Sequence, residues 1–262
     1  MMSTVTPRNP LSPFTTTTSL NTDSMATFKA LIFTRTVAYR HDSIPAGIRA
    51  IERLASTHKF DTLHTDNPAV FNDKTLAEYK VIVLLQCSGE FLDNASQIAA
   101  LKTFVRNGGG VVGIHCASFA MQSEPWYARL IGAAFESHPD PCVQTVRFNT
   151  EEKDHSLVQR WCTKGMGTGR QVMTEGGLVK EWEWTDEWYV YKETNEEIEQ
   201  RVRVLLRGGL HGENHPLAWY QEDFEGGTSF YTSLGHFGEA YEDEGFCGHL
   251  ARGIVWAARV EG

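Results

Sequence analysis

Long apolar runs and an excess of positive charge are both missing from this 262-residue chain. The longest apolar segments, such as the Val-Ile-Val-Leu-Leu run at 81–85, fall far short of the roughly 18 residues that a membrane span needs. The formal net charge of −9 leaves no basic stripe that could neutralise phosphates. We therefore expect neither a nucleic acid nor a membrane as a partner.

Paired cysteine motifs are also missing. The five cysteines form no C-x-x-C pair and no zinc-finger spacing, and their odd number argues against a complete disulfide framework. This usage predicts a reducing compartment and hence a cytoplasmic location. No H-E-x-x-H motif is present either, so any metal site has to be assembled from distant segments.

The first 27 residues lack the continuous apolar core of a secretory signal and are rich in Ser, Thr and Pro. We expect residues 1–27 to be a disordered tail and residues 28–262 to form a single domain.

After the tail, predicted strands and helices alternate. Apolar patterning predicts strands at 28–34, 60–64, 79–86 and 110–115, a helix with Ser43 as its N-cap, and a second helix at 93–106. The short crossovers predict an α/β fold with a parallel, doubly wound sheet. Beyond about residue 140 the chain becomes strand-rich, with a closing helix at 248–258 and strands predicted at 143–148, 188–191, 202–206, 217–220 and 228–234. Some of these later strands would extend the sheet in antiparallel fashion.

One histidine stands at the end of the predicted strand 110–115. The run Asn-Gly-Gly-Gly-Val-Val-Gly-Ile-His at 107–115 reads as a glycine turn followed by a buried strand that ends at His115. Ligands of parallel α/β sheets bind beyond the carboxyl ends of the strands, which favours a functional role for His115. The alternative is a structural histidine that bonds to backbone.

Two further strand ends carry polar side chains. Arg40 and His41 follow the first predicted strand and precede a helix N-terminus, where backbone N–H groups favour an anion or a polarised oxygen. His41 is a binding or acid/base candidate, while Arg40 is either a binding residue or a solvated surface charge. Glu90 follows the third strand and is a weaker candidate.

The segment Asp186-Glu187-Trp188-Tyr189 combines carboxylates, which can serve as acids or bases, with rings that can stack on a sugar. If the segment is a strand, neighbouring side chains point to opposite faces. We therefore expect either Glu187 with Tyr189, or Asp186 with Trp188, to reach one ligand. The pattern is consistent with a polyol site.

Histidines also flank the later strands. His215 and His236 each lie beside a predicted strand, and His138 is a further candidate. Catalytic zinc needs only three protein ligands, so His41, His115 and His236 are candidates for a divalent metal such as zinc.

Seven ordered blocks between Phe28 and Ala258 resemble the trehalose-utilisation ThuA-like family. They are Phe33–Ile44, Gly108–His115, Trp126-Tyr127, Ser137–Pro139, Thr185–Tyr189, His215–Trp219 and Phe230–His236. The resemblance implies a fold similar to class I glutamine amidotransferases: a flavodoxin-like three-layer α/β sandwich with a mainly parallel central sheet and a strand-rich C-terminal part. It also implies a role in sugar catabolism, including keto derivatives of disaccharides.

Three departures from related sequences bear on function. Class I amidotransferases carry a nucleophilic cysteine at the strand-to-helix turn, whereas here His115 takes that place and Cys116 follows it, so we do not expect glutaminase activity. The 118–124 loop lacks the polar residues of many relatives, and the 163–181 segment is longer and rich in Gly and Met. Both could reshape sugar contacts.

We therefore predict an enzyme of carbohydrate metabolism that acts on a sugar, keto-sugar or glycoside by histidine and carboxylate acid/base chemistry. We expect a small-molecule carbohydrate ligand. Assembly into a homo-oligomer is compatible with the sequence. The alternatives are a non-catalytic sugar-binding protein and a thiol hydrolase that uses Cys116. The predicted catalytic residues are His115, Glu187 and His236, and the predicted substrate-binding residues are Arg40, His41, Glu90, Asp186, Trp188 and His215.

Overall fold

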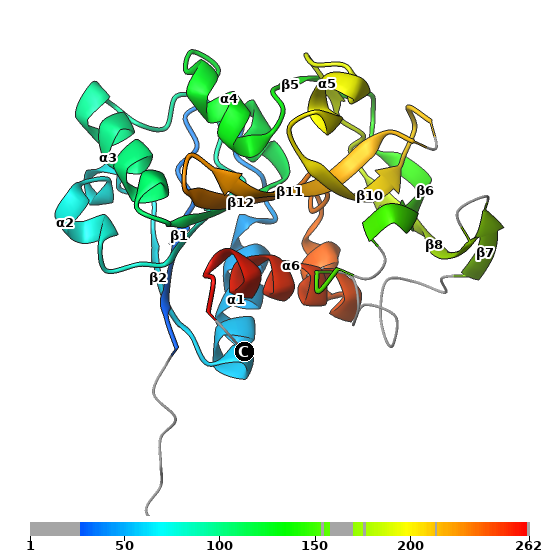
Figure 1. The fold of residues 1–262 in the computed structure, drawn as a ribbon, viewed down its shortest axis with the longest axis horizontal. Helices are drawn as coiled ribbons and strands as arrows, with labels where there is room; N and C mark the ends of the chain where they lie inside the picture. Colours follow the sequence, from blue (N-terminus) through cyan, green and yellow to red (C-terminus); the bar gives the residue numbers. More distant parts are fainter. Residues whose placement is uncertain (1–26, 153–154, 158–169, 175–176, 213, 261–262) are drawn as a thin grey trace, which may run out of the picture.

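In the computed structural model, the described residues form a central ten-stranded sheet (Figure 1). Its strand order is β2-β1-β3-β4-β12-β11-β10-β6-β8-β7. The described residues are 27–152, 155–157, 170–174, 177–212 and 214–260. The expected tail, apart from its last residue, lies outside them, as does much of the 163–181 segment.

The first five strands of that order are parallel to one another, and we call them the parallel half. They are β2 (Asp61–Thr65), β1 (Lys29–Phe33), β3 (Val81–Leu85), β4 (Gly110–Ile114) and β12 (Gly227–Thr232). β3, β4 and β12 are buried along their whole length, as expected for parallel strands covered on both faces. The predicted parallel sheet is confirmed.

The other five strands pair in antiparallel fashion, and we call them the antiparallel half. They are β11 (Pro216–Phe224), β10 (Arg203–Gly208), β6 (Cys142–Phe148), β8 (Gly177–Asp186) and β7 (Arg170–Thr174). This half is the strand-rich extension expected from the sequence. β5 (Phe135–Ser137) and β9 (Val190–Tyr191) form a separate two-stranded sheet.

Helices cover both faces of the parallel half, which gives three layers. Figure 1 shows α1 (Ile44–His58) and α6 (Glu244–Ala257) on one face and α2 (Asp73–Leu76), α3 (Ala95–Arg106) and α4 (Pro125–Ile131) on the other. Alternate residues of each strand feed the two cores: Ala30 and Ile32 pack on the α1 side, while Leu31 and Phe33 pack on the other. Short 3-10 segments and α5 (Asn195–Glu199) complete the connections.

The glycine run before β4 has two separate structural reasons. Gly108 follows the end of α3 with a φ of +92°, a conformation that glycine adopts without steric cost. Gly110 lies against α6, where an added Cβ would stand 2.2 Å from the carbonyl oxygen of Ala257. The turn and the tight sheet–helix contact both bring the start of β4 into register.

The starts of the helices match the predictions only in part. Ser43 does precede α1, but it makes no side-chain cap and its hydroxyl instead donates to Gln86. α6 begins at Glu244, four residues before its predicted start, because the Asp243 side chain caps it by accepting from the N–H of Phe246. Among the described residues, no helix has both the length and the apolar character needed to cross a membrane.

The predicted strand at 188–191 is wrong over half of its length. Only Val190 and Tyr191 form a strand, and Glu187 to Tyr189 form a loop that leaves the end of β8. β8 itself was not predicted. This loop, residues 187–189, brings polar side chains from the antiparallel half to the parallel half.

Candidate active site

Three histidines meet at the carboxyl ends of parallel strands. His41 follows β1, His115 follows β4, and His236 follows β12, which lies next to β4 in the sheet. The ring centroids of His41 and His115 are 4.7 Å apart, those of His41 and His236 are 5.1 Å apart, and those of His115 and His236 are 5.4 Å apart. The parallel topology therefore assembles a triangle of imidazoles from segments that are distant in sequence.

His115 occupies a sharp strand-to-helix turn. Its φ is 54°, a left-handed conformation that is uncommon for a residue with a side chain and that concentrates at functional sites. Its Nδ1 lies 2.7 Å from the carbonyl oxygen of Ser233. Because a carbonyl only accepts, Nδ1 carries a proton and donates it, which leaves Nε2 directed at the other histidines.

Glu187, from the loop after β8, contacts two of these rings and a further histidine. Its carboxylate oxygens lie 3.2 Å from Nε2 of His115, 3.2 Å from Nδ1 of His236 and 3.4 Å from Nε2 of His138. The Glu187 side chain is only 8% exposed. His236 and His138 are 17% and 33% exposed, so solvent reaches the cluster from their side.

Tyr189 joins Glu187 at the cluster, and Trp188 points elsewhere. The Tyr189 hydroxyl lies 2.9 Å from Nε2 of His115. Trp188 is fully buried in the core on the α1 side, and its indole N–H donates to the carbonyl of Cys142. Of the two pairings left open by the sequence, the structure brings Glu187 and Tyr189 to one place. Trp188, expected to contact substrate, is a core residue.

Asp186, also expected to contact substrate, is buried and joins two loops through hydrogen bonds; we call its carboxylate the clamp. Its carboxylate is 0% exposed and accepts from the backbone N–H groups of Glu187, Gly235 and His236. The indole N–H of Trp184 supplies a fourth bond. Burial raises the pKa of Asp186, and these donors oppose that shift. With its acceptors filled, Asp186 positions the loops that carry Glu187 and His236.

His215, also predicted to bind substrate, lies beside the 187–189 loop and contacts its backbone. It is buried, and its Nε2 donates to the carbonyl of Tyr189 over 2.9 Å. Nε2 of His211 donates to the carbonyl of Trp188, also over 2.9 Å. The two histidines are four residues apart in the sequence, a spacing that could have marked them as a pair. They fix the backbone of the 187–189 loop.

Gln86 is a buried residue that sequence reasoning missed. It follows β3 with a φ of 53°; its side-chain N–H groups donate to the Gly235 carbonyl and the Tyr241 hydroxyl, and its side-chain oxygen accepts from the Ser43 hydroxyl. These bonds tie the loop before α1 to the loop that carries His236. A polar residue directly after a wholly apolar strand was the available signal.

Two predicted substrate-binding residues stand apart from the cluster. Arg40 is exposed and its guanidinium donates over 3.4 Å to the carbonyl of Thr34 and to the hydroxyl of Thr36. Glu90 is exposed, and its carboxylate accepts from the backbone N–H and the hydroxyl of Ser123. Neither makes a contact with the histidines in the described structure.

The electrostatics of the cluster follow from burial and mutual proximity. Burial, reinforced by His115 and His236, lowers the pKa of His41 to about 3. Burial alone would raise the pKa of Glu187, but His115 and His236 outweigh it and hold that pKa well below its ordinary value. Burial would lower the pKa of His236, but Glu187 overrides it and the pKa is raised. These shifts favour an ionised Glu187 paired with His236, beside a neutral His41.

Cys116 does not have the environment of a reactive thiol. It is 3% exposed, and burial raises the pKa of its thiol well above the ordinary value. Its sulfur lies 3.5 Å from Nδ1 of His41. Because a nucleophilic cysteine needs an accessible thiolate, this arrangement argues against the thiol hydrolase alternative.

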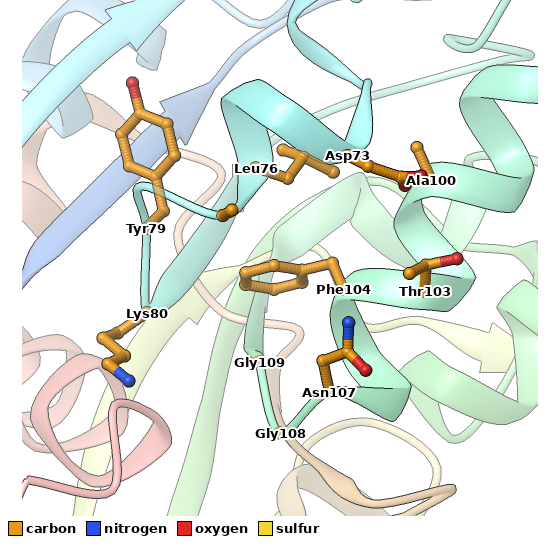
Figure 2. A pocket seen from close by; sticks show the side chains of 11 residues that line it. Asp73, Leu76, Tyr79, Lys80, Ala100, Thr103, Phe104, Asn107, Gly108 and Gly109 are labelled. Carbon is orange, nitrogen blue, oxygen red and sulfur yellow. The ribbon is translucent and has the colours of Figure 1, made fainter.

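A separate hollow of about 250 Å³ lies at the opposite ends of the strands. Figure 2 shows the Phe104 ring at its centre, between Leu76 and Gly109. Lys80 and Gly109 immediately precede β3 and β4, so this pocket opens at their amino ends, away from the histidine cluster. The histidine cluster and this hollow therefore lie at opposite ends of the parallel strands.

Solved structures share this architecture. A ThuA-like protein from Bacteroides uniformis ATCC 8492 matches with a TM-score of 0.69 at 19% identity, over 91% of this chain and 94% of that chain. A ThuA-like protein from Parabacteroides merdae ATCC 43184 matches with a TM-score of 0.62 at 18% identity, over 88% and 90% of the two chains. A cytoplasmic protein from Salmonella typhimurium matches with a TM-score of 0.54 at 12% identity, over 88% and 100%. These likenesses confirm the predicted α/β fold.

Comparison of the sequence with known families identifies the family of this chain. No curated protein matches the chain significantly. The family model for ThuA, described as trehalose utilisation, matches residues 29–257 and thus spans both halves of the sheet and every residue of the histidine cluster. The chain belongs to the ThuA family of trehalose utilisation.

Proposed function

We propose that this protein is an enzyme that acts on a sugar, keto-sugar or glycoside, with its reaction centre at the cluster of His41, His115, Glu187 and His236. The observation that carries the proposal is the position of Glu187, within 3.2 Å of both His115 and His236. A carboxylate between two imidazoles can take a proton from one substrate hydroxyl and return it to another. Membership of the trehalose-utilisation family supports a carbohydrate substrate.

The roles within the cluster follow from the hydrogen bonds. His115 is the base, because its Nδ1–H is held by the Ser233 carbonyl and its Nε2 is directed at the centre. Glu187 and His236 form the acid pair, and His236 is the more exposed of the two. His41 is buried against the His115 ring and forms the innermost polar surface of the proposed reaction centre.

An exposed aromatic ring at the rim suits a sugar ligand. Tyr39 is 65% exposed, and its ring stands edge-on to His41 with centroids 4.8 Å apart. An aromatic face binds the apolar side of a pyranose ring while hydroxyls stay free for hydrogen bonds. Tyr39 is therefore the proposed stacking platform, and Arg40 beside it is a second rim contact.

We also propose a cytoplasmic location for this enzyme. The Salmonella typhimurium neighbour is described as a cytoplasmic protein, and Cys87, Cys116, Cys142 and Cys247 are all unpaired in the described structure. Free thiols persist in a reducing compartment.

The test is turnover of a panel of disaccharides and their 3-keto derivatives, followed by mass spectrometry. Wild-type protein should convert at least one member, and His115→Ala should slow that conversion by about two to four orders of magnitude. The matched control is His58→Ala, at the far end of α1, about 20 Å along that helix from the loop that carries His41. His58→Ala should react at the wild-type rate.

Two results would overturn the proposal. Binding of a panel sugar without turnover would make the protein a non-catalytic sugar-binding protein. Full activity in His115→Ala would remove His115 from the reaction centre.

A further inference from the structure

Four side chains from four separate segments place metal-ligating atoms close together. His41, His115, Glu187 and His236 each offer one nitrogen or oxygen atom, and these atoms all lie within 4.8 Å of one another. We infer that this quartet binds a divalent first-row transition metal, with zinc as the reference ion. Three imidazoles and one carboxylate are a ligand set that zinc and iron accept in proteins.

The crowding around Nε2 of His115 is the first argument. With Nδ1 donating to Ser233, a neutral His115 has one lone pair at Nε2. That atom faces Nε2 of His41 at 3.1 Å and the Glu187 carboxylate at 3.2 Å. A carboxylate cannot donate to a lone pair, so the two acceptors repel unless a proton or a metal cation lies between them, and the Tyr189 hydroxyl at 2.9 Å adds a further polar group to the same atom. A bound cation resolves this conflict for all the groups at once.

The distances are the second argument. Zinc bonds of about 2.0–2.1 Å place tetrahedral ligand atoms about 3.3 Å apart. The separations are 3.1 Å from His41 to His115, 3.2 Å from His115 to Glu187 and 3.2 Å from Glu187 to His236. Only the widest separations in the quartet, up to 4.8 Å, need a small rotation to close.

The orientation of each ligand is the third argument. Metal-bound histidines commonly donate their second ring N–H to a carbonyl, which is the arrangement of His115 with Ser233. Nδ1 of His236 is buried, and although it lies 3.2 Å from Glu187 it has no hydrogen bond of acceptable geometry. Asp186 holds the backbone of both Glu187 and His236 in place. The side chains are thus aimed at a common point by partners outside the quartet.

Cys116 lies outside this ligand set. Its sulfur contacts Nδ1 of His41, whereas the Nε2 atom of the same ring faces His115. The metal would therefore have nitrogen and oxygen ligands without sulfur, which spectroscopy can verify.

The inferred metal rests on the proposed function for its role: with a cation bound, His115, Glu187 and His236 would act as ligands, and the cation would polarise a sugar oxygen in place of the proton transfers assigned to these side chains. Its existence can be measured without a substrate.

The experiment measures metal content and affinity of the full-length protein. Metal-free protein is titrated with Zn²⁺ by calorimetry, and a second sample is loaded with Co²⁺ for visible absorption. We expect one Zn²⁺ per chain and an affinity at least about 100-fold lower in His236→Ala. The Co²⁺ spectrum of wild type should show ligand-field bands without a thiolate charge-transfer band. His58→Ala, which keeps all four ligands and lies at the far end of α1, should bind Zn²⁺ as the wild type does.

The outcomes separate the two proposals. No stoichiometric Zn²⁺ or Co²⁺ in the wild-type protein, or equal affinity in wild type and His236→Ala, overturns the metal site. A thiolate band overturns the ligand set. Because Co²⁺ loading uses the wild-type protein, it gives a result even if His236→Ala fails to fold. Stoichiometric metal without any sugar turnover would refute the enzyme and keep the site, whereas sugar turnover by metal-free protein that binds no metal would do the reverse.

Discussion

The two halves of the sheet contribute to the candidate site in different ways. The parallel half supplies His41, His115 and His236 from the ends of its strands, where its topology gathers loops at one edge. The antiparallel half supplies Glu187 and Tyr189 from a loop whose backbone donates a hydrogen bond to Asp186 and accepts one from His215. In one half the fold itself places the functional group, and in the other half a buried polar network does.

The largest expected effect comes from removing the charge that the antiparallel half contributes. Glu187→Gln should reduce turnover of the carbohydrate substrate by about two to four orders of magnitude, because a neutral amide cannot form the acid pair with His236. The matched control is Glu183→Gln, an exposed position on the same strand, which should leave the rate unchanged. Equal rates in wild type and Glu187→Gln would show that the parallel half acts alone.

The next largest effect concerns the clamp between the halves. Asp186→Asn replaces an acceptor oxygen with an amide N–H among four donors, and should lower the free energy of unfolding by about 3 kcal/mol or more. Chemical denaturation monitored by tryptophan fluorescence measures this loss. Thr185→Ala, its exposed neighbour, is the control and should change stability by less than about 0.5 kcal/mol. Wild-type stability in Asp186→Asn would mean that the clamp does not join the halves.

A pH dependence of stability tests the core beneath the parallel half. Burial lowers the pKa of His249 in α6 to about 3, so the folded state keeps it neutral while the unfolded chain binds a proton below about pH 6.5. Stability is therefore lost as the pH falls from 6.5 towards 3. Between pH 7 and pH 5, His249→Leu should lose about 2 kcal/mol less than the wild type. Parallel stability–pH curves for the two proteins would contradict this assignment.

The smallest expected effect concerns the rim. Tyr39→Ala should raise KM several-fold with little change in kcat, because a stacking contact is worth about 0.5–1.5 kcal/mol. Tyr39→Phe keeps the ring and should behave as the wild type. A loss of kcat in Tyr39→Phe would show that the hydroxyl takes part in the reaction and that Tyr39 is more than a platform.

The sequence allowed the contribution of the parallel half to be predicted because its signals are local. An apolar strand followed by a glycine or a polar residue identifies a strand end, which is how His41, His115 and His236 were selected. Gln86 carries the same signal and could have been added. The left-handed φ of His115 follows from its place at the turn.

The contribution of the antiparallel half depends on partners that no local pattern reveals. Asp186 was expected to contact substrate, yet its carboxylate oxygens accept hydrogen bonds from N–H groups of the loop after β12, some fifty residues away. The positions of Trp188 and His215 likewise depend on contacts with segments that are distant in the sequence. Alternation along a strand predicted either Glu187 with Tyr189 or Asp186 with Trp188, but residues 187–189 form a loop, so the first grouping was offered on a wrong secondary structure.

A double-mutant cycle between the halves tests the central claim most directly: that Glu187 and the histidines act as one reaction centre. The rates of wild type, Glu187→Gln, His115→Ala and the double variant are compared on the same sugar. Because residues that act as a unit are not additive, the double variant should be about as slow as the slower single variant. A double variant slowed by the product of the two single effects would mean that the halves act independently, and would contradict the account.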